Sequence, residues 1–305
     1  MGVPTEGRKD TAAGRPWKEK PQHEPTPFRR EDRRGPASVS AAGPARSAAE
    51  RLLSVLGAFD HGRPALTLSE IARRAGLTLT TAHRLVAALT DWGALERDES
   101  GDYHIGLRLW ELAALAPRGP ALREAAMPFL EDLYESTHEN VHLAVRDGRD
   151  VVYIERISGR SAVGVRSQVG TRWPLHATGV GLVLLAHGGT ALQEEACAGP
   201  LTAFTPYTVT DPARLRSMLA QVRTTGCALS DRQITDDAVS VAAPVRGPRG
   251  EVVASVSVVV PVAGAPAQTL IPAVRIAGLG ISRALGWRPP GGTGLPSGGK
   301  PIAAR

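Results

Sequence analysis

One run of residues has the spacing of a metal-dependent hydrolase. His138-Glu139-Asn140-Val141-His142 matches the motif H-E-x-x-H, in which two histidines one helical turn apart bind zinc and the glutamate acts as a general base. The pattern around it favours another structure, because Asn140 is typical of a helix end and a strand-like segment begins at Val141. Histidines four positions apart on a strand would lie about 13 Å from each other, at roughly 3.3 Å per residue, too far to share one ion. A zinc hydrolase using His138 and His142 therefore stays an alternative, and we predict no catalytic residue, metal site or cofactor.

A second chemical pattern is the loop at residues 173–181, WPLHATGVG, which leads into an apolar helix at 182–186. Free backbone N–H groups at a helix start can hold a carboxylate. Ordinary packing of an apolar helix behind a turn explains the same residues equally well. Ser240 and Ser257 are hydroxyls in otherwise apolar strands, which indicates either local hydrogen bonding or a polar cavity for a small ligand.

A third pattern has the chemistry of DNA recognition. After Leu77 the apolar positions 82, 85, 86 and 89 form one helical stripe, and short polar side chains with one arginine occupy the opposite face. Such a face at a helix start suits insertion into a major groove. We therefore predict DNA contacts from Thr78, Thr80, Thr81, His83, Arg84 and, on the hairpin that follows, Arg97. For His83, packing within the domain is an alternative to a DNA contact.

Two short helices joined by a turn must present that face. Thr67 and Glu70 have the spacing of a capping box, Gly76 is suited to end the first helix, and Thr78 is suited to cap the second. A helix at 47–59 precedes this pair, and a hairpin with the turn DESGD follows it. Three helices and a hairpin predict a winged helix-turn-helix DNA-binding domain over residues 46–106.

The rest of the chain predicts a larger second domain. A disordered arm is expected at 1–45, a linker helix at 107–120, an effector-binding domain at 121–287 and a disordered tail at 288–305. In the second domain, helices are expected at 121–137, 182–186, 211–226 and 266–285, and strands at 141–146, 151–157, 162–168, 239–246 and 251–261. This order indicates an α+β fold with an antiparallel sheet.

The charge distribution limits how DNA could be bound. The chain has a formal net charge of +6 over 305 residues. Residues 47–118 contain eight basic and nine acidic side chains, so binding must depend on the placement of a few arginines. A sensor module that no longer binds DNA therefore stays an alternative function. The cluster Arg29, Arg30, Arg33 and Arg34 in the arm could add a DNA contact or belong to a solvated tail.

Composition also excludes several classes of protein. The two cysteines, Cys197 and Cys227, form no C-x-x-C pair, so neither a disulfide framework nor a structural zinc site is expected. There is no apolar run of about 18 residues and no apolar segment of a secretion signal, so we expect no membrane span. A reduced, cytoplasmic location fits these features.

Several ordered blocks resemble the IclR family of bacterial transcription regulators. They are residues 66–98, 103–113, 147–157, 169–186 and 239–261, and the likeness extends over about residues 45–287. The resemblance implies a winged-helix domain joined to a GAF-like α/β effector-binding domain. It also implies homodimers or dimers of dimers on a double-stranded palindromic operator, with a small acid or an aromatic metabolite as effector. The predicted function is a sequence-specific transcription regulator, repressor or activator, that is not an enzyme.

The resemblance also implies the effector site. It would use the backbone of Gly179 and Val180, and the side chains of Ser230, Asp231, Ser240, Ser257 and Val259. The chain departs from the family in four places. TLTT at 78–81 replaces Pro-Lys-Ser-Thr, which removes one lysine contact, and Gly181-Leu182-Val183 replaces Gly-Lys-Ala. Ser240 stands where a cysteine is frequent, and Val259 replaces a serine. We therefore expect a less polar pocket than in members that bind very small acids.

Overall fold

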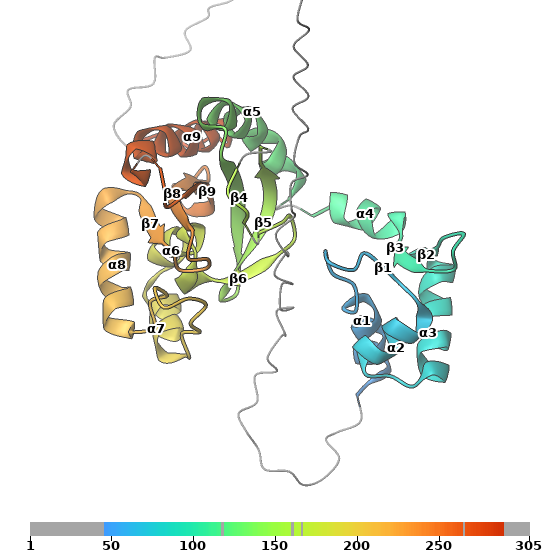
Figure 1. The fold of residues 1–305 in the computed structure, drawn as a ribbon. Coiled ribbons are helices and arrows are strands. Elements are labelled where there is room, and N and C mark those ends of the chain that lie inside the picture. Colours follow the sequence, from blue (N-terminus) through green and yellow to red (C-terminus); the bar gives the residue numbers. More distant parts are fainter. Residues whose placement is uncertain (1–45, 117–118, 160–161, 166, 265, 290–305) are drawn as a thin grey trace, which may run out of the picture. The chain divides into compact units, whose positions relative to one another are not determined.

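The computed structural model describes residues 46–116, 119–159, 162–165, 167–264 and 266–289 (Figure 1). The arm expected at 1–45, with its arginine cluster, lies outside the described residues, as does the tail expected at 288–305 except for its first two positions. None of the described helices is long and apolar enough to cross a membrane.

The first domain is a winged helix, as predicted. Its elements are α1 (Ala48–Leu56), β1 (Ala65–Leu66), α2 (Leu68–Ala75), α3 (Leu79–Trp92), β2 (Leu95–Arg97) and β3 (Tyr103–Ile105). The three strands form an antiparallel sheet in the order β1-β3-β2. β1 was not predicted, because two residues are too short for strand alternation to show.

Local hydrogen bonds fix the turn between α2 and α3. The Thr67 hydroxyl accepts from the backbone N–H of Glu70 at 3.2 Å, and the Glu70 carboxylate accepts from the N–H of Thr67 at 3.0 Å, which confirms the capping box. Gly76 ends α2 with φ 65°, the left-handed conformation that glycine adopts without strain. Thr78 caps α3 by accepting from the N–H of Thr81.

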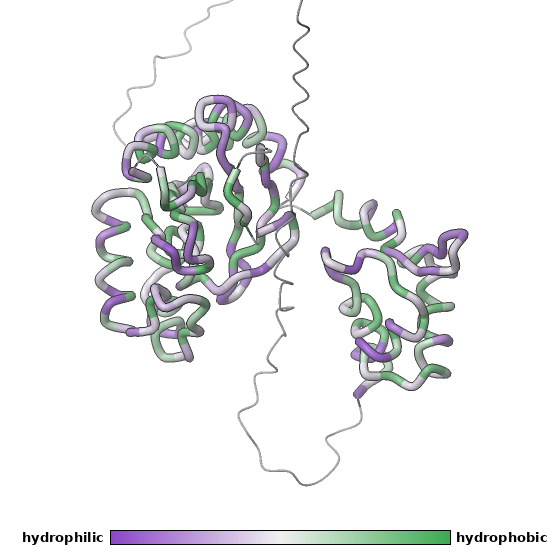
Figure 2. Tube along the Cα trace, in the orientation of Figure 1, coloured by the Kyte–Doolittle hydropathy of each residue, from purple (hydrophilic) through white to green (hydrophobic). Residues whose placement is uncertain are grey.

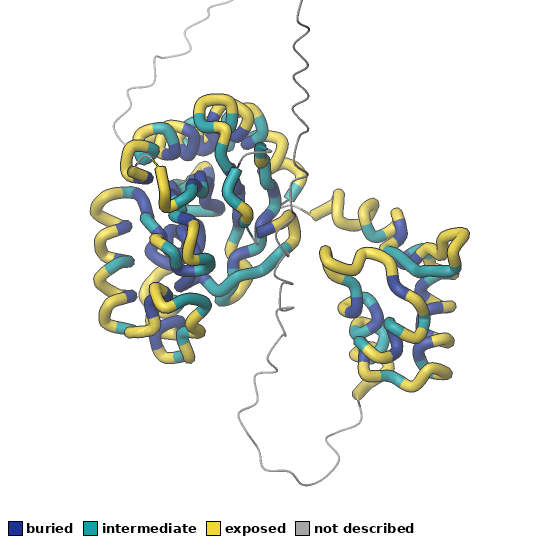
Figure 3. Tube along the Cα trace, in the orientation of Figure 1, coloured by how far each residue is buried: buried dark blue, intermediate teal, exposed yellow. Residues whose placement is uncertain are grey.

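One face of α3 is buried against the rest of this domain. Ala82, Leu85, Val86 and Leu89 are buried, which confirms the predicted stripe. Polar and apolar residues alternate along the helices of this domain (Figure 2), and in Figure 3 α3 is buried on one side and exposed on the other. Packing therefore leaves the predicted DNA-reading face free.

The helix after the wing is α4 (Leu107–Ala114). The Glu96 carboxylate on β2 accepts from the backbone N–H of Leu107 at 2.8 Å and so anchors its first turn. None of its residues is buried.

The second domain is built on one six-stranded antiparallel sheet. Its strand order is β6-β5-β4-β9-β8-β7. The strands are β4 (Asn140–Asp147), β5 (Asp150–Ile157), β6 (Arg172–Pro174), β7 (Ala228–Asp231), β8 (Ala238–Arg246) and β9 (Val252–Pro261). The helices are α5 (Pro120–Thr137), α6 (Gly179–Ala186), α7 (Thr190–Ala198), α8 (Pro212–Thr225) and α9 (Ile271–Ala284). α5 and α9 cover one face of the sheet, and α6 packs on the other with α7 and α8 beside it (Figure 1).

Alternation along the strands separates two apolar cores. On β4, Val141 and Leu143 join the core under α5 and α9, whereas Ala144 joins the core around α6. Because successive side chains on a strand point to opposite faces, His142 lies on the α6 side with Ala144. This face of the sheet carries the polar residues discussed below.

The prediction of a strand at 162–168 is wrong. The described residues of this segment are irregular, and β6 takes the place beside β5 instead. Side chains bind its carbonyl groups: the Asn140 amide donates to Val163 O at 2.7 Å and the Arg156 guanidinium to Ser167 O at 3.1 Å. Helix α7 and strand β7 were not predicted.

Candidate nucleic-acid interface and ligand cavity

The exposed face of α3 presents the predicted DNA contacts together. Thr78, Thr80, His83 and Arg84 are exposed and Thr81 is half-buried. The hydroxyls of Thr78 and Thr81 bond to each other at 2.9 Å, so both belong to the cap as well as to the surface. Their role in DNA binding stays a prediction.

Arg97 lies on the wing and is held there. Its Nε donates to Gly101 O at 2.9 Å, and its guanidinium carbon lies 5.4 Å from the centre of the Tyr103 ring. The turn beside it contains Asp98 and Asp102, and hydrogen bonding from Ser100 is the main cause that holds the pKa of Asp98 below its ordinary value. The acidic turn disfavours DNA phosphates, so a wing contact would depend on Arg97.

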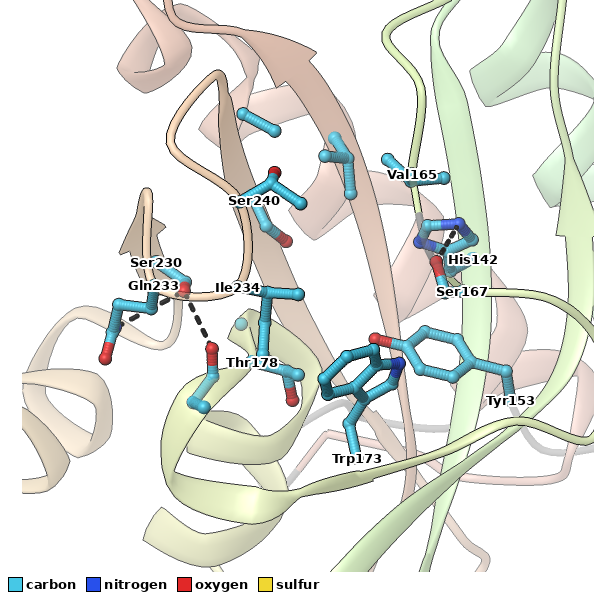
Figure 4. A pocket seen from close by; sticks show the side chains of 15 residues that line it. His142, Tyr153, Val165, Ser167, Trp173, Thr178, Ser230, Gln233, Ile234 and Ser240 are labelled. Atoms are coloured by element: carbon cyan, nitrogen blue, oxygen red, sulfur yellow. Dashed lines mark hydrogen bonds between the residues drawn. The ribbon is translucent and has the colours of Figure 1, made fainter. Parts of the chain in front are cut away.

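A cavity lies between the sheet and the start of α6 (Figure 4). Its empty space is about 490 Å³, part of it open to solvent. It is lined by His142, Tyr153, Val165, Ser167, Trp173, Ala177, Thr178, Gly179, Ser230, Gln233, Ile234, Thr235, Ala238, Ser240 and Val259. These residues include no Lys, Arg, Asp or Glu. Apolar walls with a few hydroxyl and amide groups are typical of small-ligand sites.

The cavity brings together four of the seven residues predicted for the effector. They are Gly179, Ser230, Ser240 and Val259. The other three do not line it. Val180 is buried in the core around α6, Asp231 is bound by the Arg232 guanidinium at 2.9 and 3.0 Å, and Ser257 is buried on β9 opposite His142. Effector contacts by all seven stay predictions.

The start of α6 faces this cavity. The Thr178 hydroxyl caps it by accepting from the N–H of Gly181 at 3.0 Å. A Cβ atom on Gly179 would lie 2.7 Å from Ser240 Oγ, so glycine is what lets this hydroxyl approach the backbone. The positive end of a helix and nearby hydroxyls can together hold a carboxylate.

The opposite wall contains residues that we did not predict as ligand contacts. His142, Tyr153 and Ser167 line it, and His142 Nε2 lies 3.1 Å from Ser167 Oγ. Tyr153 meets the His142 ring edge to face at 5.1 Å. Strand alternation from Val141 onward predicts the side of the sheet on which His142 lies, but not that a cavity forms there.

The H-E-x-x-H run does not lie on one helix. α5 ends at Thr137, His138 takes a left-handed conformation with φ 54° as the helix cap, and His142 lies within β4. The predicted strand and helix end are therefore confirmed. The shared helical face that the zinc motif requires is not formed.

Burial controls the protonation of this wall. It lowers the pKa of His142 to about 3, and the positive charge of Arg156 acts in the same direction. Burial also raises the pKa of Tyr153, although a hydrogen bond with Thr178 opposes this shift. Both side chains are therefore uncharged near neutral pH.

Acid is expected to destabilise this domain through His142. The unfolded chain protonates the imidazole near pH 6.5, whereas the folded chain keeps it neutral down to about pH 3. Above pH 6.5 this titration does not lower the free energy of unfolding. As the pH falls from 6.5 toward 3, the free energy of unfolding decreases by about 1.4 kcal/mol per pH unit. Urea unfolding between pH 7 and pH 4 measures this loss. The slope should be smaller in His142→Phe, and equal slopes in the two proteins would contradict the assignment.

Known proteins match both parts of the chain. The model of the IclR helix-turn-helix domain matches residues 48–99, and that of the bacterial transcriptional regulator IclR C-terminal domain matches residues 118–283. The HTH-type transcriptional regulator XynR of Escherichia coli is 34% identical over 243 residues, which cover 78% of this chain and 96% of XynR. KipR of Bacillus subtilis is 30% identical over 207 residues, 68% of this chain and 82% of KipR.

Solved structures agree. An IclR homologue from Microbacterium hydrocarbonoxydans, complexed with 4-hydroxybenzoate, superposes with a TM-score of 0.75 at 38% identity. The match covers 78% of this chain and 99% of that one. Thermotoga maritima IclR superposes with a TM-score of 0.66 at 25% identity, over 78% of this chain and 98% of that one.

Proposed function

Because the chain belongs to the IclR family of bacterial transcriptional regulators, we propose that a homodimer reads a palindromic operator and that a small aromatic carboxylate controls this binding. The observation that carries the proposal is the presence, in one chain, of an exposed polar face on α3 and an uncharged cavity at the start of α6. The regulator would act in the cytoplasm, where bacterial DNA is, and would catalyse no reaction.

The chemistry of the cavity supports an aromatic carboxylate. Trp173, Ile234 and Val259 supply apolar surface for a flat ring. The start of α6, with the hydroxyls of Thr178 and Ser240, suits the carboxylate. The Microbacterium relative is complexed with an aromatic acid of this kind, 4-hydroxybenzoate.

An electrophoretic mobility shift with the promoter region beside the protein's own gene tests the proposal. The wild-type chain should retard this DNA and not an unrelated fragment of equal length, and benzoates should change the fraction bound. Retardation of both fragments alike would contradict sequence-specific operator recognition, and retardation of neither would favour a sensor that works without DNA. Unchanged binding with benzoates would contradict the effector class.

An exposed apolar face on α4 supports the homodimer. Leu107, Trp110 and the C-cap residue Leu115 are 64%, 69% and 78% exposed, and Leu107 and Trp110 line a groove with Ile105 and Leu109. Such a surface at the end of a small domain suits a second copy of the same helix. A pair of such dimers is the other assembly that the family resemblance implies.

Trp110→Glu is expected to convert the dimer to a monomer, because a carboxylate would be buried where the apolar faces meet. Sedimentation velocity at micromolar concentration measures the change. Ile276→Glu on α9 is a matched control, since Ile276 is also 69% exposed, and it should leave the dimer intact. A Trp110→Glu chain that sediments as a dimer would place the interface elsewhere.

A further inference from the structure

The cavity has a second polar side, opposite the start of α6. In Figure 4, His142, Ser167 and Tyr153 lie on one side, and Thr178 and Ser230 on the other. His142 is 1% exposed. Its Nε2 pairs with Ser167 Oγ at 3.1 Å, whereas its Nδ1 is buried and has no hydrogen-bond partner.

Burial without a partner distinguishes His142 Nδ1 from the other polar groups of the cavity. Thr178 caps α6, and the Ser230 hydroxyl donates to the carbonyl of Ala177. Among the described residues, three other side chains have a buried polar atom without a partner, and none of them lines the cavity. A buried, unpaired nitrogen is costly, and a ligand that supplies the missing bond removes this cost.

The surroundings of His142 define the group that would pair with it. The ring is neutral, and the Ser167 hydroxyl can donate to Nε2 or accept from it, so Nδ1 can be either acceptor or donor. A ligand hydroxyl serves both cases, because it also donates and accepts. An ammonium group is disfavoured by the positive charge of Arg156, which lies opposite His142 on β5.

We infer that His142 is a specificity-determining residue that selects effectors with a hydroxyl group at the end remote from the carboxylate. The inference rests on the proposed function, because it takes the carboxylate to lie at the start of α6. Val165 beside His142 and Ile234 near Thr178 provide apolar contact for the body of the ligand (Figure 4). The ligand class is thus a hydroxylated aromatic acid in preference to the unsubstituted acid.

Calorimetric titration with benzoate and 4-hydroxybenzoate tests the inference, because the two acids differ only in the hydroxyl. The wild-type chain should bind 4-hydroxybenzoate at least about tenfold more tightly, and His142→Phe should reduce this ratio to about one. His142→Gln retains an amide that can donate and accept, and should recover part of the preference. His187→Phe is the matched control, since His187 bonds Val183 O at the end of α6 and does not line the cavity.

The ratio of the two affinities separates recognition from structural support. If His142 has only a structural role, His142→Phe will weaken the binding of both acids in parallel and leave the ratio of their affinities unchanged. That result would overturn the inference. A wild-type chain that binds both acids equally would overturn it too, while the carboxylate proposal would stand. If neither acid binds the wild-type chain, the proposed effector class fails and this inference fails with it, whereas the mobility shift still tests operator binding separately.

Discussion

Arg84→Ala is expected to weaken operator binding by at least about thirtyfold. Arg84 is exposed on the outer face of α3, and no hydrogen bond or ion pair holds its guanidinium within the described part of the chain. One specific arginine contact contributes about 1–3 kcal/mol, and a symmetric dimer loses two of them. The first domain has no excess of positive charge to compensate. Fluorescence anisotropy with a labelled operator measures the loss.

The control for this experiment is Arg283→Ala, which removes the same charge from the exposed surface of α9 in the second domain. It should change operator affinity by less than about twofold. Measurements at several salt concentrations add a second criterion, because a lost phosphate contact lowers the salt slope by about one per protomer. If Arg84→Ala binds the operator as tightly as the wild-type chain, the assignment of α3 as the reading helix is wrong.

Gly181→Ala is expected to destabilise the second domain by about 1–3 kcal/mol. A Cβ atom at this position would lie 2.3 Å from Leu175 O and 2.7 Å from Leu175 Cα, which are backbone atoms that cannot turn aside. Alanine favours a helix interior over glycine by about 1 kcal/mol, and this gain does not offset the clash. The displacement would also move the helix start away from the cavity. Urea unfolding measures the loss of stability, and titration with 4-hydroxybenzoate measures the loss of affinity.

Gly164→Ala provides the matched control, because a Cβ atom there meets no atom within 4 Å and the residue is exposed. This variant should unfold at the wild-type urea concentration. Equal stability of the Gly181→Ala and Gly164→Ala chains would contradict this prediction, because it would show that α6 and Leu175 can move apart without measurable cost.

The winged helix could be predicted in detail because its signals are local. Thr67 and Glu70 are three residues apart, Gly76 ends one helix, and Thr78 begins the next. Each signal acts through hydrogen bonds to backbone groups only a few positions away. The sheet domain was predicted in outline for a similar reason, since the long apolar runs of β8 and β9 are joined by a short turn.

The cavity could be predicted only in part, because strand pairing between distant segments builds it. The pairing of β4 with β9 places His142 opposite Ser257, and the pairing of β4 with β5 places it opposite Arg156. Ser167 reaches the cavity from an irregular segment that resembled a strand in its apolar pattern. Local patterns indicated Gly179 and Ser240, and the family resemblance added Ser230 and Val259. Alternation along β4 gives the side of the sheet on which His142 lies, but not the segments that build a cavity there.

The two edges of the six-stranded sheet have a consequence for behaviour at high concentration. The sheet ends in its two shortest strands, β6 with three residues and β7 with four. Pro174 has no N–H to offer on the β6 side, and Asp231 and Arg232 place charges at the end of β7. Short, interrupted and charged edges are poor templates for a strand from another chain. Expression to high levels should therefore not lead to aggregation through this sheet. In a truncated chain, aggregation is expected instead through the exposed apolar face of α4.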